Sequence, residues 1–121
     1  MKQKFNFVIP VLPSQDIQRD LKRYQEKAGF ETIFSDSMYA GIFRNGINIH
    51  LQWLADTKED PLLGGSVIKI FVDDIESIFQ EFVERGTVAK DKLRKNTLWN
   101  THEFGFYDLN NNSVFFVQAI K

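Results

Sequence analysis

The sequence predicts an α+β protein of two βαβββ modules, which form a curved mixed-sheet cleft with a helix outside each module. First, the order strand, helix, three strands occurs twice along the 121 residues. Second, the apolar pattern in each half changes between a period of two and a helical period. Third, each predicted helix ends at a glycine, Gly29 or Gly86. This length suits a single domain, with module 1 at about residues 1–56, a linker at about 55–65 and module 2 at about 66–121.

Module 1 is predicted to open with a buried strand over residues 5–12. Ser14 is a suitable N-cap for the helix that follows. The apolar side of this helix is predicted to contain Ile17, Leu21, Tyr24 and Ala28. Strands are expected at residues 30–34, 38–43 and 47–53. Asn45-Gly46 predicts a hairpin between the last two, because both turn positions require a positive φ.

Module 2 is predicted to repeat this plan, starting with a strand over residues 67–72. Asp73 and Glu76 have the spacing of a capping box. The helix after them carries an apolar stripe made of Ile75, Ile78, Phe79, Phe82 and Val83. A short strand near residues 87–89 and a final hairpin of residues 102–107 and 113–117 complete the module. The hairpin turn, residues 108–112, contains three consecutive asparagines and no glycine.

Composition excludes several functional classes. The net charge of -1 provides no general attraction to nucleic acid or to anionic membranes. The absence of cysteine excludes disulfides, thiolate nucleophiles and cysteine-bound metal. No segment approaches the roughly 20 apolar residues of a membrane span, and the N-terminus lacks the features of a signal peptide. We therefore expect a cytoplasmic protein.

Five segments, in their order and spacing, resemble the vicinal oxygen chelate superfamily. This superfamily includes glyoxalase I, extradiol dioxygenases, fosfomycin-modifying enzymes and bleomycin resistance proteins, and the local likeness is to the bleomycin-resistance-like branch. The segments are Ile9–Asp16, Ile49–Leu51, Val72–Ile75, Trp99–Phe104 and Asp108–Asn112. Asn111 and Asn100 stand where the family usually has glycine, and His102 stands where it has arginine. Asparagine tolerates the left-handed conformation that such a turn requires.

The resemblance also locates four positions where enzymes of the superfamily carry metal ligands. These positions correspond to Ile9, His50, Val67 and Phe115. Three of the four are hydrocarbon side chains, and a divalent ion needs several nitrogen or oxygen ligands. We therefore expect no metal site of the family type, no cofactor and no catalytic residues carried over from the family.

The candidate ligand-binding residues come from several predicted strands and one loop. Asn48, His50 and Gln52 alternate with apolar residues, which places them together on one face of a strand. A solvated or inter-strand hydrogen-bonded row is the structural alternative. Lys69 is expected to face the cleft, where it would pair with a ligand carboxylate or with Glu103. Trp99 either stacks on a flat ligand or fixes its loop to the core. The complete set of candidates is Asn48, His50, Gln52, Lys69, Trp99, His102, Phe104 and Phe115.

Three functions follow from these expectations. The first is a metal-independent homodimer that sequesters a planar or aromatic antibiotic-like molecule in a dimer cleft. The second is an enzyme, a metal-dependent glyoxalase-type lyase or thiol transferase that uses His50. The third is a dimeric interaction module with a closed cleft. The identity of the ligand, and whether the modules pair within a chain or between chains, are left open by the sequence.

Overall fold

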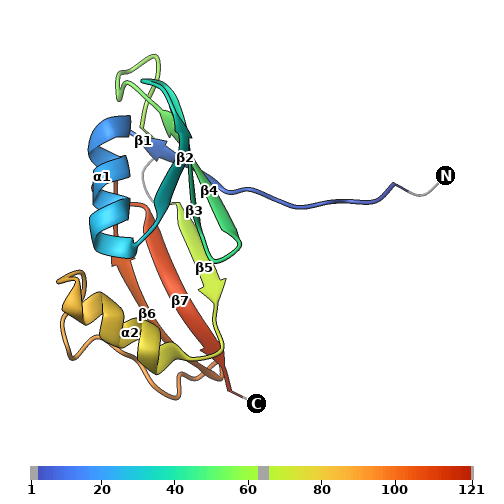
Figure 1. Cartoon of the computed structure of the whole chain (residues 1–121), viewed down its shortest axis with the longest axis vertical. Helices are drawn as coiled ribbons and strands as arrows, with labels where there is room; N and C mark the ends of the chain where they lie inside the picture. Colours follow the sequence, from blue (N-terminus) through green and yellow to red (C-terminus); the bar gives the residue numbers. More distant parts are fainter. Residues whose placement is uncertain (1–2, 63–65, 121) are drawn as a thin grey trace.

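Module 1 forms a four-stranded mixed sheet. The structure, a computed structural model, describes residues 3–62 and 66–120. The strands are β1 (Val11–Ser14), β2 (Glu31–Ser35), β3 (Tyr39–Arg44) and β4 (Ile47–Trp53), in the order β1-β4-β3-β2. β1 lies parallel to β4, and the other neighbours are antiparallel. Helix α1 (Ile17–Ala28) covers one side of this sheet (Figure 1).

Module 2 repeats this topology with one strand fewer. Its strands β5 (Val67–Phe71), β6 (Thr101–Tyr107) and β7 (Ser113–Ala119) have the order β5-β7-β6, with β5 parallel to β7. Helix α2 (Ile75–Glu84) lies on the same side of the molecule as α1 (Figure 1). The α+β class and the two modules are therefore confirmed. The predicted linker lies between them, and its residues 63–65 are outside the described part of the chain.

The strand predicted near residues 87–89 is absent from the described structure. The N–H groups of Thr87 and Val88 bond the carbonyl of Phe82 at the end of α2, and the Thr87 hydroxyl donates to the carbonyl of Lys27 in α1. These contacts hold the segment against the two helices, away from the edge of β6. A single bridge between Arg94 and Glu103 takes the place of the missing edge strand.

The two helices begin at Ile17 and Ile75, directly after Asp16 and Asp74. The N-caps are Asp16 and Asp74, which accept hydrogen bonds from the N–H groups of Arg19 and Ser77. The prediction of Ser14 as a cap was wrong, because this residue ends β1 and donates its hydroxyl to Asp20. The predicted capping box at Asp73 was wrong by one residue, because the N-cap is the next residue, Asp74. Gly29 and Gly86 end the helices with positive φ, as predicted.

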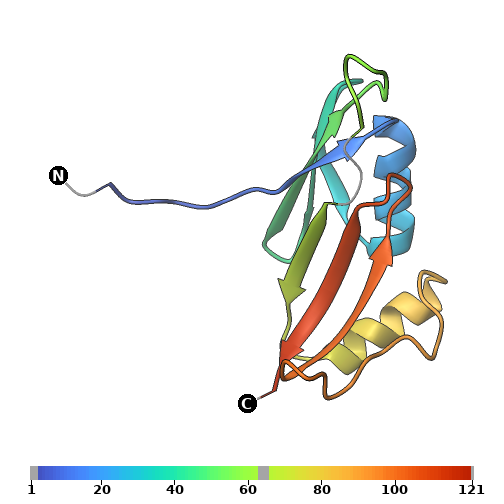
Figure 2. The ribbon, with the colours of Figure 1, turned by 180° about the vertical axis from the view of Figure 1, so that it is seen from behind.

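The first strand is much shorter than the predicted strand over residues 5–12. β1 begins at Val11, and residues 3–10, here called the arm, form no strand. The arm runs out from the side of the molecule opposite the helices (Figures 1 and 2). Phe5, Phe7 and Val8 are 92%, 79% and 91% exposed. Its last residue, Pro10, still accepts the His50 N–H at 2.9 Å, and the register of β1 on β4 starts at Val11 opposite His50.

The core lies between the sheets and the two helices. In module 1, the strand side chains Ile49 and Leu51 are fully buried beneath α1. In module 2, four phenylalanines form an aromatic cluster between α2 and its sheet, with ring centroids 5.0–5.7 Å apart for the pairs in contact: Phe79, Phe82, Phe104 and Phe116. The helical periodicity predicted these contacts correctly for the stripe of α2.

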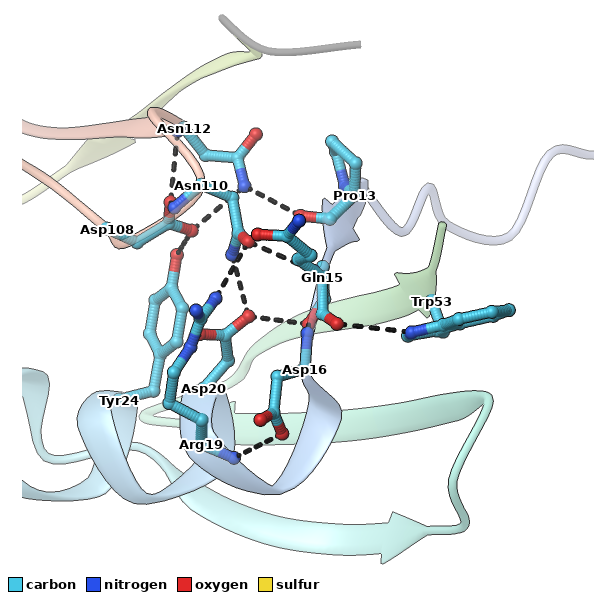
Figure 3. Close-up of polar contacts among 11 residues, drawn as sticks. Pro13, Gln15, Asp16, Arg19, Asp20, Tyr24, Trp53, Asp108, Asn110 and Asn112 are labelled. Atoms are coloured by element: carbon cyan, nitrogen blue, oxygen red, sulfur yellow. Dashed lines mark hydrogen bonds and ion pairs between the residues drawn. The ribbon is translucent and has the colours of Figure 1, made fainter. Parts of the chain in front are cut away.

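The asparagine-rich hairpin turn of module 2 fastens the two modules together. Asn110 donates its amide to the buried carboxylate of Asp20 in α1 at 2.6 Å. The amide oxygen of Asn110 accepts from the Arg19 guanidinium at 2.9 Å and from the Gln15 N–H at 3.0 Å (Figure 3). Asn110 is 3% exposed, so these bonds are shielded from water. We call the contacts between this turn and module 1 the latch.

The second half of the latch uses Asn112 and Asp108. Asn112 donates to the carbonyl of Pro13 at 3.0 Å and to Asp108 at 2.9 Å, and the Tyr24 hydroxyl donates to Asp108 at 2.8 Å (Figure 3). Asn111 at the tip has a φ of 64°, which confirms the predicted left-handed conformation. Polar side chains that the sequence placed in a loop therefore hold the modules in a fixed relation.

Candidate functional site

The candidate site is the open face, the side of both sheets that is turned away from α1 and α2. Alternate residues of each strand reach this face because successive side chains point to opposite sides of a sheet. Both helices lie on one side of the molecule and the arm leaves from the other (Figure 2). One copy of the chain thus presents the open faces of its two modules toward the same side.

On module 1, the open face carries a small aromatic group around His50. The Tyr39 hydroxyl lies 2.9 Å from Nδ1 of His50, and the Phe34 ring meets the His50 ring edge to face at 5.3 Å between centroids. Phe34 also stacks on Tyr39 and covers Gly41, where a Cβ atom would collide with the ring. Asn48 and Gln52 flank His50 on the same strand and are exposed, as the alternation predicted.

On module 2, the open face is more apolar. Val67 and Phe71 of β5 are 58% and 66% exposed, and Lys69 lies between them. Lys69 is the direct cross-strand neighbour of Phe115 on β7. The Phe115 ring covers Gly105, where a Cβ atom would lie 2.6 Å from a ring carbon. Lys69 and Asn48 line the same hollow of about 290 Å³ at the seam between the modules, together with arm residues.

Trp99 and Glu103 form the other end of the open face. Trp99 is 54% exposed, and its Nε1 donates to the Glu103 carboxylate at 3.1 Å. The Thr101 hydroxyl donates to the same carboxylate oxygen at 2.8 Å. Burial raises the pKa of Glu103, but these two hydrogen bonds and the positive charges of Lys69 and Arg94 outweigh it and hold the pKa below its usual value. The loop is thereby fixed while Trp99 stays more than half exposed.

Two candidate residues do not lie on the open face. Phe104 is 2% exposed and packs against Phe79 and Phe82 under α2, so its assignment to the cleft was wrong. His102 is two residues away on the same strand and therefore shares the side of Phe104. Its Nδ1 accepts from the backbone N–H of Asn96 at 3.0 Å. The register of β6 explains both corrections, because Glu103 and Gly105 occupy the open side.

Sequence reasoning missed Phe34 and Tyr39 as members of the site. Strand β2 contains a register shift between Thr32 and Phe34, which turns Phe34 toward Tyr39 and His50. Such an irregularity leaves no periodic signal in the sequence. Tyr39 could have been assigned to the open face from the sequence, because it is two residues from Gly41 on β3 and therefore lies on the same face as Gly41, the neighbour of His50.

The strand registers show which residues correspond in the three strands that the two modules share. Gly41 pairs with His50 on β4, and Gly105 pairs with Phe115 on β7. His50 pairs with Val11 on β1, and Phe115 pairs with Lys69 on β5. His50 thus corresponds to Phe115. Counting back two residues from Val11 and Lys69, Ile9 corresponds to Val67.

These four positions are those that the family resemblance assigned to metal ligands. Hydrocarbon at three of them does not fit a divalent ion, which needs nitrogen or oxygen donors. Across residues 3–62 and 66–120, no three histidine, cysteine, aspartate or glutamate side chains are grouped as a metal site requires. No helix of the described chain has the length and apolar character needed to cross a bilayer.

Comparison with known proteins identifies relatives in sequence and in structure. No family model matches the chain. It is 26% identical to the bleomycin resistance protein of Geobacillus stearothermophilus and, equally, to that of Staphylococcus aureus, over 93% of this chain and 96% of the relative. Each match runs through both modules.

Solved structures share the whole fold. A glyoxalase/bleomycin resistance protein/dioxygenase from Nocardioides has a TM-score of 0.77 at 14% identity, covering 100% of this chain and 87% of that one. The bleomycin-binding protein of Streptomyces verticillus, solved with copper(II)-bleomycin, has a TM-score of 0.73 at 23% identity, covering 99% and 100%. A bleomycin resistance determinant encoded on the transposon Tn5 has a TM-score of 0.76 at 17% identity, covering 95% and 98%.

Proposed function

We propose that this chain, a member of the vicinal oxygen chelate superfamily on its bleomycin-resistance-like branch, sequesters a flat, antibiotic-like small molecule without chemical change. The proposal places the ligand on the open face, between aromatic side chains of the two modules. Binding would protect the target of the compound by lowering its free concentration. The ligand-binding residues proposed are Asn48, His50, Gln52, Lys69, Trp99 and Phe115, together with Phe34 and Tyr39.

The observation that carries the proposal is the exposure of large apolar side chains on the open face. Phe71 and Trp99 are more than half exposed, and Phe34 is nearly half exposed. Large apolar side chains that are exposed on one face typically mark a binding site. Aromatic rings flanked by a few polar groups suit a planar ligand, because the rings stack on it while the polar groups fix its orientation.

The polar groups on this face are suited to holding a ligand. His50 is hydrogen-bonded by Tyr39, while Asn48 and Gln52 keep exposed amides that offer both donors and acceptors. Lys69 adds a positive charge beside Phe115. Three of the four positions where enzymes of the superfamily carry metal ligands are hydrocarbon side chains here, so we propose binding that requires no metal held by the protein. A ligand that itself carries a metal ion is compatible with this proposal.

We also propose that two copies complete the site. The open faces of one copy look toward the same side and leave their apolar residues uncovered. The arm adds Phe5, Phe7 and Val8, which are almost fully exposed in one copy. Burying an exposed phenylalanine contributes about 1.5–3 kcal/mol, so a dimer that covers the arm gains substantial stability. A second copy whose arm lies against the open face would turn each face into a cleft.

The binding experiment is a calorimetric titration of the wild-type protein with metal-free bleomycin and with copper(II)-bleomycin. We expect binding at micromolar concentration or tighter, and recovery of unchanged bleomycin after incubation. Trp99→Ala should weaken binding at least tenfold. The control Leu98→Ala truncates a fully exposed apolar residue in the same loop and should change the affinity less than twofold.

Two results would contradict the proposal. Equal affinities for the Trp99 and Leu98 variants would place the ligand elsewhere on the molecule. Turnover of a hemithioacetal after addition of zinc or nickel would favour the glyoxalase-type alternative. A further measurement tests the dimer separately: light scattering should give twice the chain mass of 14.1 kDa. The variant Phe5→Ser/Phe7→Ser should shift the protein toward the monomer.

A further inference from the structure

We propose a second binding site on the helix side of the molecule, which takes a small organic anion with an apolar body. The site is a cavity of about 380 Å³ between α1, the segment after α2 and the end of β6. Its principal lining residues are Arg23, Tyr24, Lys27, Val88, Lys92 and Phe106. The volume lies within the range of roughly 300–1,000 Å³ in which proteins bind small molecules.

The charge at the mouth of this cavity is strongly positive. Arg23 and Lys27 lie on α1, and Lys92 follows α2, so two elements bring three cations to one cavity. None of the three is within ion-pair distance of a carboxylate in the described part of the chain. This concentration of positive charge contrasts with the net charge of -1 for the whole chain. A local cluster of unpaired cations attracts an anion even when the protein as a whole does not.

The single carboxylate that lines the cavity is already engaged. Asp108 is 6% exposed and accepts the Tyr24 hydroxyl at 2.8 Å and the Asn112 amide at 2.9 Å. Its other oxygen accepts the backbone N–H groups of Asn110 and Asn112. Both carboxylate oxygens of Asp108 are thus occupied by hydrogen bonds from Tyr24 and from the hairpin turn. The three cations are therefore left to face a ligand.

The floor of the cavity is apolar and aromatic. The rings of Tyr24 and Phe106 meet edge to face with centroids 6.3 Å apart, and Val88 lies beside them. Tyr24 presents its ring rather than a free hydroxyl, because that hydroxyl donates to Asp108. An apolar floor beneath cationic walls matches a ligand with one aromatic ring and one phosphate or carboxylate group.

The floor of this site lies away from the open face, and Lys92 at its rim also lines a smaller hollow with Phe115. Tyr24 and Phe106 belong to the helix side, whereas the proposed antibiotic-binding residues lie on the opposite side of the sheets. The cavity spans both modules beside the latch, so an occupant contacts module 1 through α1 and module 2 through β6. Binding should therefore also raise the melting temperature, because a ligand held by both modules opposes their separation.

The test titrates the ¹⁵N-labelled protein with phenyl phosphate and, separately, with benzoate, and measures the shifts of the backbone amide signals by NMR. We expect the largest shifts at residues 87–92 and 105–107. The double variant Lys27→Ala/Lys92→Ala should weaken binding by at least tenfold for whichever of the two anions the wild type binds. The control Lys22→Ala/Lys90→Ala removes the same charge from the same two segments outside the cavity, and should change the affinity less than twofold. Phenol and inorganic phosphate, which lack one half of the ligand, should bind at least tenfold more weakly.

The outcomes separate a real site from general electrostatic attraction. Tighter binding of phenyl phosphate or of benzoate identifies the head group, and either supports the proposal. Equal weakening by the two double variants, or shifts confined to the open face near His50 and Lys69, would overturn it. Lys27 also donates to the carbonyl of Arg85, so Arg23→Ala serves as a second variant. Arg23 lines the same cavity and forms no salt bridge within the described structure, so this variant should weaken binding at least threefold.

Discussion

The side-chain amide of Asn110 donates to the carboxylate of Asp20 at 2.6 Å, across 90 residues of sequence and between the two modules. Asp20 is completely buried, and it also accepts the Ser14 hydroxyl and pairs with Arg19. The contact joins a hairpin turn of module 2 to the helix of module 1. A turn that the sequence presented as a local structure is thus a buried polar connection between the modules, beside the ion pair that joins Arg44 of β3 to Glu81 of α2.

Replacing Asn110 should destabilise the whole chain. Asn110→Ala leaves the buried Asp20 without one donor and the Gln15 N–H without its acceptor. Unsatisfied buried groups of this kind cost about 1–3 kcal/mol each. We expect urea denaturation to show a loss within that range or slightly above it. Asn48→Ala, an exposed asparagine on the open face, is the control and should lose less than about 0.5 kcal/mol.

The buried tyrosine Tyr24 should make stability dependent on alkaline pH. Burial, followed by the negative charge of Asp108, raises the pKa of Tyr24 above its ordinary value of 10.0. The folded state therefore favours the neutral phenol, and this contribution is complete below about pH 10 and is lost as the pH rises further. We expect the free energy of unfolding of the wild type to fall between pH 9.5 and 11.

The variant Tyr24→Phe separates this effect from other alkaline titrations. It removes the titrating hydroxyl and its bond to Asp108, so it should be less stable at pH 8 by about 1 kcal/mol. Its stability should then decline less steeply above pH 10 than that of the wild type. If the free energies of unfolding of the two proteins fall in parallel above pH 10, Tyr24 does not cause the loss of stability at alkaline pH. Tyr107→Phe, which is largely exposed, should behave as the wild type.

Glu103 should contribute to stability on the acid side. Its pKa is lowered on balance, despite the opposing effect of burial, by Trp99, Thr101 and the neighbouring cations. A depressed folded-state pKa gives stability that is present above the ordinary value of 4.5 and is lost as the pH falls below it. Glu103→Gln should therefore flatten the dependence of unfolding free energy on pH between 3 and 5. Glu59→Gln, an exposed linker residue, should leave that dependence unchanged.

Gly41 should tolerate a methyl group only if Phe34 is removed. A Cβ atom at position 41 would collide with the Phe34 ring, so Gly41→Ala should destabilise the protein by about 1–3 kcal/mol. In the background of Phe34→Ala the same change should cost much less. A double-mutant cycle measures this coupling. Additive effects in the cycle would mean that the penalty arises from the backbone and not from the ring.

The elements with strong periodicity were predictable, and the edges of the sheets were not. The stripes of α1 and α2, the Asn45-Gly46 hairpin and the register of β4 all follow from local spacing. The length of the first strand was overestimated, because its apolar residues indicate that the segment is covered but do not show which part of the protein covers it. The strand at 87–89 was wrong because Thr87 and Val88 bond to Phe82 and Lys27, contacts that local propensity does not contain.

The candidate site was predictable to the same extent. Period two correctly placed Asn48, His50 and Gln52 on one face, because one face of β4 is covered by α1. The same period places His102, Phe104 and Phe106 together on the other face of β6, the face that α2 covers, so His102 and Phe104 lie away from the open face. Phe34 reaches His50 only through the irregular register of β2. Features that depend on irregular or long-range pairing thus stay outside the reach of pattern analysis.

The latch also determines how the open face meets a ligand. Asn110, Asn112 and Asp108 hold the turn of module 2 against α1 and β1 through buried hydrogen bonds (Figure 3). The two sheets therefore keep one fixed curvature before any ligand arrives. A preorganised surface loses little conformational entropy on association. Recognition by this protein should accordingly be rapid and close to rigid-body docking, with shape selectivity set by the folded chain and without closure of one module on the other.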